Sequence, residues 1–359
     1  MDTLTHALSG ALLARATEAK SPGPDQLPRR LRMWVGFWAA AFPDSDFVLR
    51  FMDDPLTYLA LHRGITHSII MLPLWATGLA FLFTLIARRR YSWKAFAGVC
   101  MLGIGIHIAG DLITAFGTMI LAPFSTWRAQ IPTTFIIDPY FTSILVAGLV
   151  ASMIWKHTRA PAAIGLGVLT GYVGFQAILH GRAVALGQAY IAAQGLEPAR
   201  AHAVPQPLSP FNWMVVVEQP NAYHLAHVSL LRAETAPEPP ADASWSQRLS
   251  ASYRPVKDAQ WQQVPRYGAV NPDVKLVQAA WKSDLLARYR DFALFPAVYR
   301  VDRGPARTCV WFQDLRFAIR GRAPPFRYGA CREDGQAPWK VYQLSGNNDG
   351  AEFLEAIPD

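Results

Sequence analysis

The apolar stretch from Ala95 to Ala122 constrains this chain most, because it places His107 and Asp111 among 28 residues that contain no other charged side chain. As a helix rising about 1.5 Å per residue, this run is long enough to cross a bilayer. Its two polar residues are four positions apart, so they share one helix face. An ionised group at membrane depth costs about 2.5–3.5 kcal/mol on insertion scales and usually has a function. The alternative is a His–Asp hydrogen bond that joins two helices.

Hydropathy predicts an α-helical membrane domain over residues 1–182. Three further apolar runs, 65–87, 135–155 and 161–179, have about the length of a span. Two shorter apolar segments, 3–16 and 33–42, precede them and are too short to cross a bilayer. We therefore expect about four spanning helices and two short N-terminal helices that are re-entrant or packed against the others. Glycines recur in the central run, as expected where helices pack closely in lipid.

The second half of the chain has a different texture. Alternating β-branched and aromatic stretches, separated by Pro, Gly, Asn and Asp, predict a small antiparallel β-rich domain over residues 205–359. We expect residues 183–204 to form a helical connector. The net charge of +8 comes with no basic stripe that interleaves aromatic residues, so we expect no nucleic-acid partner. Cys309 and Cys331 could pair if this half lies outside the cytoplasm.

The distribution of basic residues predicts the orientation of the helices. Eleven Lys and Arg residues lie in the segments 15–32, 88–94 and 156–159, against three in the alternate loops. Since cytoplasmic loops are enriched in basic residues, the first set is predicted to be cytoplasmic. The C-terminal domain would then be periplasmic. With this orientation the unusual polar residues of the membrane half fall at a similar, outer depth. They are His6, Asp44, Asp46, His67, His107, Asp111, Asp138, His180 and Arg182.

Histidines and carboxylates without cysteine form a ligand set suited to Zn²⁺ or Mn²⁺. Seven candidates exceed one tetrahedral site, so we expect two metals, which would activate water for displacement at phosphorus. Arg63 has the fork geometry to bind a phosphate oxygen. Simpler interpretations remain for His6 as an interfacial residue and for Asp44 and Asp138 as helix caps. The candidate ligands are His6, Asp44, Asp46, His62, His67, His107 and Asp111, with Asp138, His180 and Arg182 as secondary candidates.

Four motifs in order resemble those of an inner-membrane metal-dependent hydrolase family, also described as LexA-binding, inner-membrane-associated hydrolases. They are Thr5-His6, PDSD at 43–46, HRGITHS at 62–68 and HIAGD at 107–111. The resemblance covers about residues 1–180. The family is distantly similar to zinc-dependent phospholipase C and P1-type nucleases, which implies a zinc cluster at these residues. A later His-x-x-x-Glu motif of those enzymes does not follow Asp111.

Taken together, the residues and the resemblance predict a hydrolase of the bacterial inner membrane. We expect a phosphoester substrate, lipid or lipid-linked, attacked by metal-activated water, with Arg63 and Asp111 as catalytic residues. The main rival is a non-enzymatic scaffold with a structural metal, whose β domain binds an unidentified protein. A transporter that uses His107 and Asp111 as a relay is a third possibility, although no inverted repeat is recognisable.

Overall fold

The structure is a computed structural model that describes residues 1–19, 26–52, 55–268, 273–304, 307–333, 338–345 and 350–354. Its contacts divide the chain into two compact units. Unit 1 contains Met1–Val48 and Leu61–Ile178, and unit 2 contains Leu49–Ala60 and Leu179–Asp359. Unit 2 therefore includes a short stretch, 49–60, that we expected within the membrane domain.

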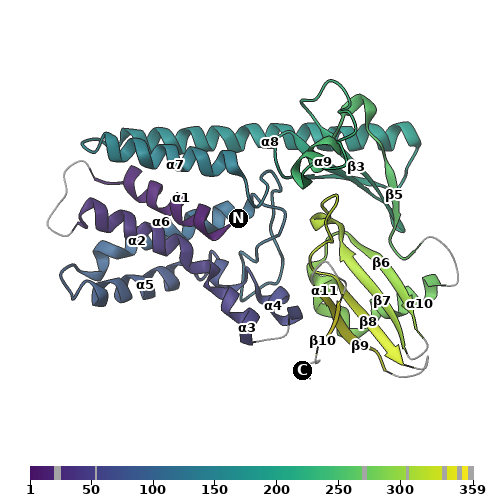
Figure 1. Ribbon diagram of the computed structural model, residues 1–359. Coiled ribbons are helices and arrows are strands. Elements are labelled where there is room, and N and C mark those ends of the chain that lie inside the picture. Colours follow the sequence, from purple (N-terminus) through teal and green to yellow (C-terminus); the bar gives the residue numbers. More distant parts are fainter. Residues whose placement is uncertain are drawn as a thin grey trace. The chain divides into compact units, whose positions relative to one another are not determined.

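Unit 1 is helical (Figure 1). Its first helix is capped by Asp2, whose carboxylate accepts the backbone N–H of Thr5 at 3.0 Å. The central helix, expected to reach residue 122, ends at Leu112, and the chain then turns at Gly117 with φ of +89°. The elements are α1 (Thr3–Ala16), α2 (Arg29–Ala41), η1 (Phe42–Val48), η2 (Ile65–His67), α5 (Leu72–Ile86), α6 (Trp93–Leu112), α7 (Pro139–Ile154) and the first part of α8 (Ala160–Gln194).

Close packing of α1, α2 and α6 depends on three glycines. A Cβ on Gly10 would lie 2.2 Å from the carbonyl oxygen of Gly36, and a Cβ on Gly36 would lie 2.5 Å from that of Gly10. On α6, a Cβ on Gly103 would come within 2.8 Å of the Ala39 side chain. No residue with a side chain fits these positions unless the helices move apart. Small residues thus bring three helices to the separation that the polar residues require.

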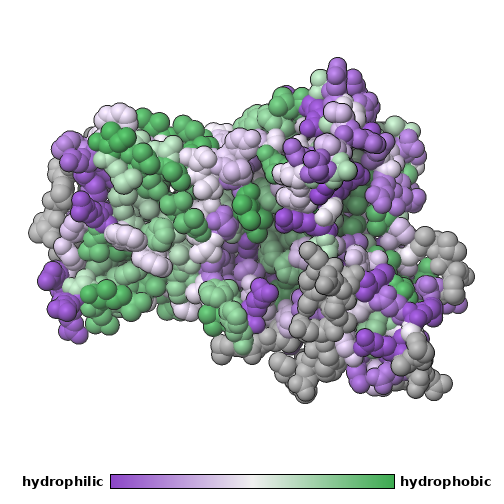
Figure 2. All heavy atoms as spheres, viewed as in Figure 1, coloured by the Kyte–Doolittle hydropathy of each residue, from purple (hydrophilic) through white to green (hydrophobic). Residues whose placement is uncertain are grey.

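Fewer helices reach the length of a span than the sequence predicts. Among the described residues, α6 and α8 are long and apolar enough to cross a membrane. A third span exists if Pro55–His67 and Leu72–Ile86, which are bent by 76°, are counted as one. The predicted count of four is not confirmed, because α7 has only 16 residues. Figure 2 shows hydrophobic residues over these helices and hydrophilic ones at their far end, on the left of the view.

Unit 2 contains two sheets. In the first, β1 (Arg200–Pro205), β2 (Asn212–Glu218) and β3 (Ala222–Ser229) are antiparallel neighbours, and β3 also pairs with β4 (Arg254–Pro255) and β5 (Gln262–Pro265). The last part of α8 covers this sheet through Leu179 and Ala183. The helical connector predicted for residues 183–204 is helical only to Gln194, where α8 ends, and its last residues belong to β1. The short helices of this unit are α3 (Leu49–Met52), α4 (Pro55–Leu61), α9 (Trp245–Ala251), α10 (Asp273–Lys282) and α11 (Ala287–Phe292).

The second sheet is an antiparallel meander in the order β10-β9-β8-β7-β6. Four consecutive residues are buried in β7 (309–312) and four in β8 (328–331), so both faces of these strands are covered and burial does not follow the predicted alternation. Cys309 and Cys331 face each other across these strands and form a disulfide. The pairing that the sequence left open is therefore present. The strands are β6 (Pro296–Arg303), β7 (Arg307–Asp314), β8 (Tyr328–Glu333), β9 (Lys340–Ser345) and β10 (Gly350–Leu354).

Candidate metal centre

Four side chains of unit 1 direct one ligand atom each toward a common centre: Asp44 from η1, His67 from η2, and His107 and Asp111 from α6. The two Nε2 atoms lie 3.0 Å apart, and they lie 3.2 Å (His67) and 3.4 Å (His107) from Oδ2 of Asp111. Oδ1 of Asp44 lies 3.7 Å from His67 and 3.6 Å from His107. Both histidines and Asp111 are fully buried.

These separations fit a tetrahedral cation. Ligand bonds of about 2.0–2.1 Å, typical of Zn²⁺, place the corners of a tetrahedron about 3.3 Å apart. The five distances between the donor atoms of Asp44, His67, His107 and Asp111 range from 3.0 to 3.7 Å around this value. Nitrogen and carboxylate oxygen are also the donors that Zn²⁺ and Mn²⁺ accept. The cluster could therefore hold a metal ion.

The tautomer of His107 is set by the backbone of α2. Its Nδ1 lies 2.6 Å from the carbonyl oxygen of Ala40, which can only accept a hydrogen bond. The proton of a neutral imidazole therefore resides on Nδ1, and the Nε2 lone pair faces the centre. The ring of His107 also stacks on that of His6, with 3.7 Å between their centroids.

His67 is oriented by the hydroxyl group of Thr66, which lies between the imidazole and Asp46. Its Nδ1 lies 2.9 Å from Oγ1 of Thr66 and 3.6 Å from Oδ2 of Asp46. Burial opposes the ionisation of Asp46, but hydrogen bonds from His62 and from the backbone N–H of Arg63 lower the pKa of its carboxyl group below the ordinary value. The Thr66 hydroxyl donates to Oδ2 of the ionised Asp46 at 3.5 Å, so its oxygen can accept the Nδ1 proton of His67 and link the imidazole to the carboxylate. Of the two aspartates, Asp44 faces the centre and Asp46 supports it.

The two oxygens of Asp111 have different surroundings. Oδ1 is contacted by Nε2 of His6 at 3.0 Å, by Nη2 of Arg63 at 3.1 Å and by the amino group of Met1. Oδ2 has no hydrogen-bond partner within the described part of the chain and faces the two Nε2 atoms. A buried acceptor without a donor is costly, so this atom is a further sign of a cation at the centre.

Arg63 is enclosed rather than directed to solvent. Besides Asp111, its guanidinium donates to Oγ1 of Thr114 at 2.9 Å and lies 4.7 Å from the ring centroid of Phe116. Its side chain is 3% exposed, and its φ of +58° places it in the left-handed region. Its backbone N–H bonds Asp46 at 2.9 Å, which holds this conformation. The geometry favours a role in holding Asp111 over the phosphate contact that we predicted.

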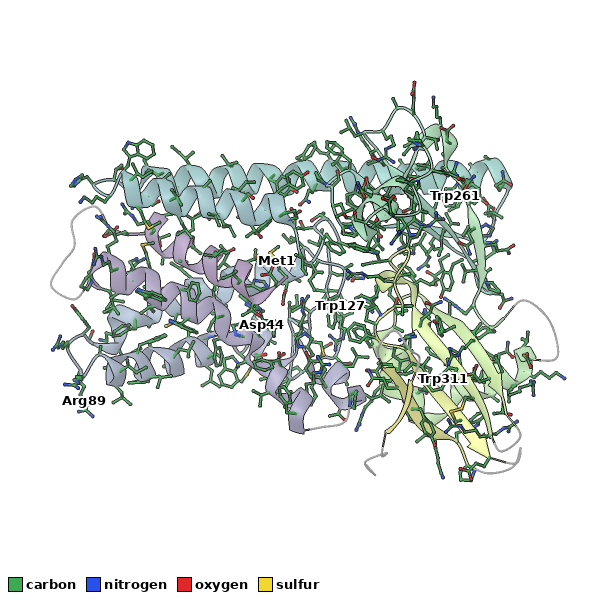
Figure 3. All side chains as sticks on the ribbon, viewed as in Figure 1. Met1, Asp44, Arg89, Trp127, Trp261 and Trp311 are labelled. Atoms are coloured by element: carbon green, nitrogen blue, oxygen red, sulfur yellow. A yellow bond between two sulfur atoms is a disulfide. The ribbon has the colours of Figure 1, made fainter. Side chains whose placement is uncertain are left out.

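The accessible side of the cluster is at Asp44 and His62, whose side chains are 13% and 16% exposed. Oδ2 of Asp44 accepts a hydrogen bond from the hydroxyl group of Thr3 at 2.6 Å. His62 contacts Oδ1 of Asp46 at 3.0 Å and thus lies behind the ligand His67. Figure 3 shows Met1 and Asp44 close together at one end of the helices of unit 1, with Arg89 at the opposite end.

The three secondary candidates belong to other surroundings. Asp138 caps α7 through the backbone N–H groups of Tyr140 and Phe141, and its second oxygen accepts from Tyr172 and Gln176. His180 packs beside the ring of Trp213 in unit 2, with 5.7 Å between the ring centroids and 60° between the ring planes. Arg182 is exposed. None of the three is in the four-residue cluster.

Sequence reasoning missed several groups that support the centre: the carbonyl of Ala40, the hydroxyl groups of Thr66 and Thr114, and the amino group of Met1. Thr66 lies inside the HRGITHS motif, so its position was a usable signal. Thr114 follows Asp111 by three residues and bonds its carbonyl oxygen at 2.8 Å. The carbonyl of Ala40 had no signal, because every residue has a carbonyl group.

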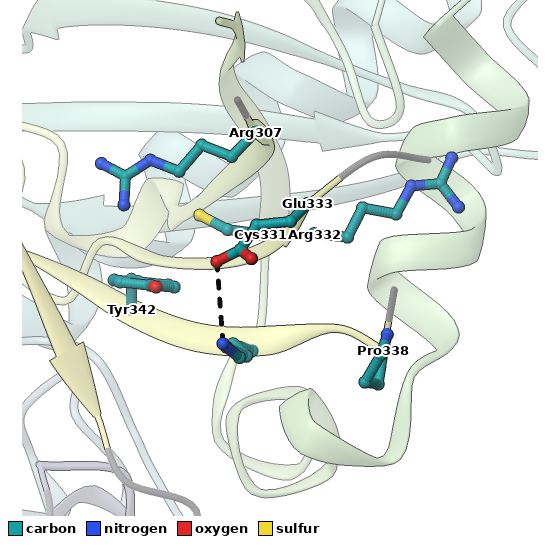
Figure 4. Close-up of a pocket in the computed structure, with 7 residues that line it drawn as sticks. Arg307, Cys331, Arg332, Glu333, Pro338 and Tyr342 are labelled. Atoms are coloured by element: carbon teal, nitrogen blue, oxygen red, sulfur yellow. Dashed lines mark ion pairs between the residues drawn. The ribbon is translucent and has the colours of Figure 1, made fainter. Parts of the chain in front are cut away.

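A separate cavity of about 170 Å³ lies in the second sheet of unit 2 (Figure 4). Its basic side chains are already partnered: Lys340 pairs with Glu333 at 3.7 Å, and the guanidinium of Arg307 lies 5.3 Å from the ring centroid of Tyr342. The described lining contains no histidine, serine or threonine, and its cysteine belongs to the disulfide. The lining residues are Arg307, Cys331, Arg332, Glu333, Pro338, Lys340 and Tyr342.

Comparison with known proteins supports the membrane assignment. The sequence profile of the YdjM inner membrane protein family matches residues 1–183, about half of the chain and all four motifs. The chain belongs to this family. The match agrees with the family that the motifs indicate, whereas hydrolase activity and the likeness to phospholipase C and P1 nuclease rest on resemblance alone.

One curated relative is the uncharacterized protein YfhP of Bacillus subtilis (strain 168), which is 28% identical over 179 residues. The match spans 49% of this chain and 52% of that protein. No solved structure matches the chain. The YdjM region contains all four residues of the candidate metal cluster, so the cluster lies in the part of the chain that matches the family.

Proposed function

We propose that this member of the YdjM family is a membrane-embedded metal-dependent hydrolase that acts on a phosphoester. The observation that carries the proposal is the buried convergence of two histidine nitrogens and two carboxylate oxygens at separations of 3.0–3.7 Å. A cation at their centre would balance four acceptor atoms that converge with no donor between them in the described part of the chain. Such a centre within a membrane is typical of function rather than of packing.

We assign one divalent cation to the four ligands, with Zn²⁺ preferred and Mn²⁺ as the alternative. A bound cation of this type supplies Lewis acidity, which lowers the pKa of a coordinated water to about 7 and polarises a phosphoryl oxygen. Of the other three ligands predicted from sequence, His6 contacts Asp111 and Asp46 lies 3.6 Å from His67, whereas His62 bonds Asp46. Any second cation would need these outer groups to rearrange.

The side chains of the protein provide orientation and access. Hydrogen bonds at Nδ1, to the carbonyl oxygen of Ala40 and to the hydroxyl group of Thr66, keep the Nε2 lone pairs of His107 and His67 toward the centre. Arg63 and His6 hold Asp111 through one oxygen and leave the other for the cation. Asp44 is the most exposed of the four ligands, so substrate and water would approach on its side.

We further propose that the centre opens on the periplasmic side. Asp44 and Arg89 lie at opposite ends of unit 1 (Figure 3), and the loop with Arg89 belongs to the segments predicted to be cytoplasmic. The Cys309–Cys331 disulfide supports the same assignment for the C-terminal region, because disulfides persist outside the reducing cytoplasm.

Metal analysis combined with an activity assay tests the proposal. Protein purified in detergent should contain about one Zn²⁺ or Mn²⁺ per chain and should hydrolyse lipid phosphomonoesters or phosphodiesters. Chelation should abolish hydrolysis, and the restored metal should recover it. His107→Ala should lose the metal and the activity together, whereas His157→Ala, an exposed control, should keep both. Hydrolysis that survives complete metal removal would refute the proposal.

One observation favours a second candidate, a scaffold with a structural metal. Four protein ligands close a tetrahedron, whereas catalytic zinc sites usually keep one position for water. In that case the metal would be present without hydrolysis of any phosphoester, and its removal would unfold the protein. Asp44→Ala, which removes the exposed ligand, separates the two cases. A structural site should bind the metal more weakly, whereas a catalytic site should retain it on the three remaining ligands.

A further inference from the structure

The loop between α6 and α7, residues 113–138, exposes large apolar side chains although it is not helical. Phe124 is 82% exposed and Trp127 is 59% exposed. The only charged side chain of residues 113–137 is Arg128, and its guanidinium turns inward to the carbonyl oxygen of His62 at 3.1 Å. A water-facing loop would normally have the opposite pattern. Leu121, Ile131 and Ile137 are also exposed.

This loop is bonded to the elements that carry the metal centre. The backbone N–H of Met119 donates to the carbonyl oxygen of Arg63 at 2.9 Å, and the hydroxyl group of Ser68 donates to that of Ile120 at 3.2 Å. Farther along, the N–H of Ile131 donates to the carbonyl oxygen of Leu112 at the end of α6. The loop thus contacts both the HRGITHS turn and the helix with His107 and Asp111. Whatever surface the loop binds is held at a constant distance from the centre.

The exposed residues continue the apolar surface of α7. Ile137 and Tyr140 stand at its beginning, and Val146 and Val150 follow on the same helix, all of them exposed. Figure 3 shows Trp127 at the same end of unit 1 as Asp44, opposite Arg89. Aromatic residues at the end of an apolar helical surface are typical of the membrane–water interface, where the rings lie at the level of the headgroups.

We propose that the α6–α7 loop inserts Phe124 and Trp127 into the outer headgroup region of the bilayer and so presents the metal centre to lipid phosphates. The occupant of this surface is the lipid interface, because the exposed surface is apolar, aromatic and continuous with the exposed apolar side chains of α7. The claim about the substrate rests on the proposed function, whereas the insertion of the loop is independent of catalysis. It narrows the substrate class to phosphoesters whose phosphate lies at headgroup depth.

Insertion can be measured on the full chain by spin labelling. Cys100 is buried and Cys309 is bonded to Cys331, so Phe124→Cys offers one reactive thiol. The labelled protein is placed in nanodiscs of phosphatidylethanolamine and phosphatidylglycerol, and collision with oxygen is compared with collision with a water-soluble nickel complex. Val168→Cys, exposed on the candidate span α8, is the lipid-facing control. Glu234→Cys, in an exposed part of unit 2, is the aqueous control.

Phe124→Cys should give an oxygen-to-nickel ratio between the two controls and several times that of Glu234→Cys. A ratio equal to that of Glu234→Cys would overturn the insertion, and so would protection from both reagents, which would mean that protein covers the loop. Neither outcome depends on hydrolysis.

A kinetic comparison tests the link to substrate. The double variant Phe124→Ser/Trp127→Ser should raise KM for phospholipid in vesicles at least fivefold and leave KM for a water-soluble phosphoester unchanged. Thr126→Ser, between the two positions, is the matched control and should change neither. An equal loss on both substrates would contradict lipid presentation. If the wild-type protein hydrolyses neither substrate, the proposed function fails while the spin-label result still decides the insertion.

Discussion

Nδ1 of His107 on α6 donates a hydrogen bond of 2.6 Å to the carbonyl oxygen of Ala40 on α2, and this contact exists because both helices present small residues where they cross. If α2 and α6 were farther apart, this hydrogen bond would be lost, and neither the orientation of the imidazole nor its tautomer would be fixed. The candidate metal centre therefore depends on the packing of two helices as much as on its four converging side chains.

Gly103→Ala tests that dependence. The new Cβ would lie 2.8 Å from the Ala39 side chain and 3.1 Å from the backbone nitrogen of Ala40, so α2 and α6 must separate. We expect a loss of about 1–3 kcal/mol in the free energy of unfolding, typical of overpacking, together with weaker metal binding. Gly98→Ala on the same helix meets nothing within 4 Å and should keep both properties. Thermal unfolding and metal titration measure the two effects, and equal behaviour of the variants would contradict this role for Gly103.

Asp111→Asn and Asp44→Asn should differ although both remove a ligand charge. Asp111 neutralises the buried guanidinium of Arg63, and breaking a buried pair typically costs about 3–5 kcal/mol. Asp44 is partly exposed and bonds Thr3, so its loss should reduce metal affinity with a smaller effect on stability. Metal content and the unfolding midpoint of each variant, both measured after chelation and reloading, separate the two contributions. A more stable Asp111→Asn protein would show that the pair is not needed.

Arg63→Lys should weaken metal binding rather than activity alone. The guanidinium uses separate nitrogens for Asp111 and Thr114, and one lysine ammonium cannot reproduce this fork. Loss of a group that orients a ligand typically costs about 10–100-fold in metal affinity. Competition with a chelator of known affinity measures the change. Full metal affinity with lost hydrolysis would instead favour the phosphate contact that the sequence suggested.

The location of the C-terminal region can be tested in cells. If it is periplasmic, Cys309 and Cys331 should resist alkylation until a reductant is added, and a phosphatase reporter fused after the last residue should be active. The same reporter fused at Arg89 should be inactive. Free thiols in cells, combined with the reverse reporter pattern, would place the metal centre on the cytoplasmic side.

Acid should destabilise unit 2 through His227. Burial, with a smaller contribution from Arg320, lowers the pKa of this imidazole to about 4 from its ordinary 6.5. The unfolded chain therefore binds a proton that the folded chain does not, and stability falls as pH decreases from 6.5 toward 4, by at most about 1.4 kcal/mol per pH unit. His227→Gln should reduce this slope, whereas the exposed His157→Gln should not. Unfolding midpoints at pH 7 and pH 5 provide the comparison.

Several features could be predicted from the sequence because they depend on local pattern. The apolar run around His107 and Asp111 required a membrane helix, and their spacing of four placed them on one face, where the structure has them. Alternation in the second half predicted the antiparallel strands for the same reason. Chemistry alone indicated that histidines and aspartates of the four motifs belong to one centre.

Other features depended on contacts between distant segments, and only the folded chain determines them. Spacing could not distinguish Asp44 from Asp46, because both belong to one short turn and the choice is made by α6 and η2 packed against it. The pairing of Arg63 with Asp111 joins residues 48 positions apart, and the number of spans depends on a bend of 76° that hydropathy does not register. Hydropathy and periodicity describe neighbouring residues within one element, whereas the candidate metal centre is assembled from residues of three elements, η1, η2 and α6.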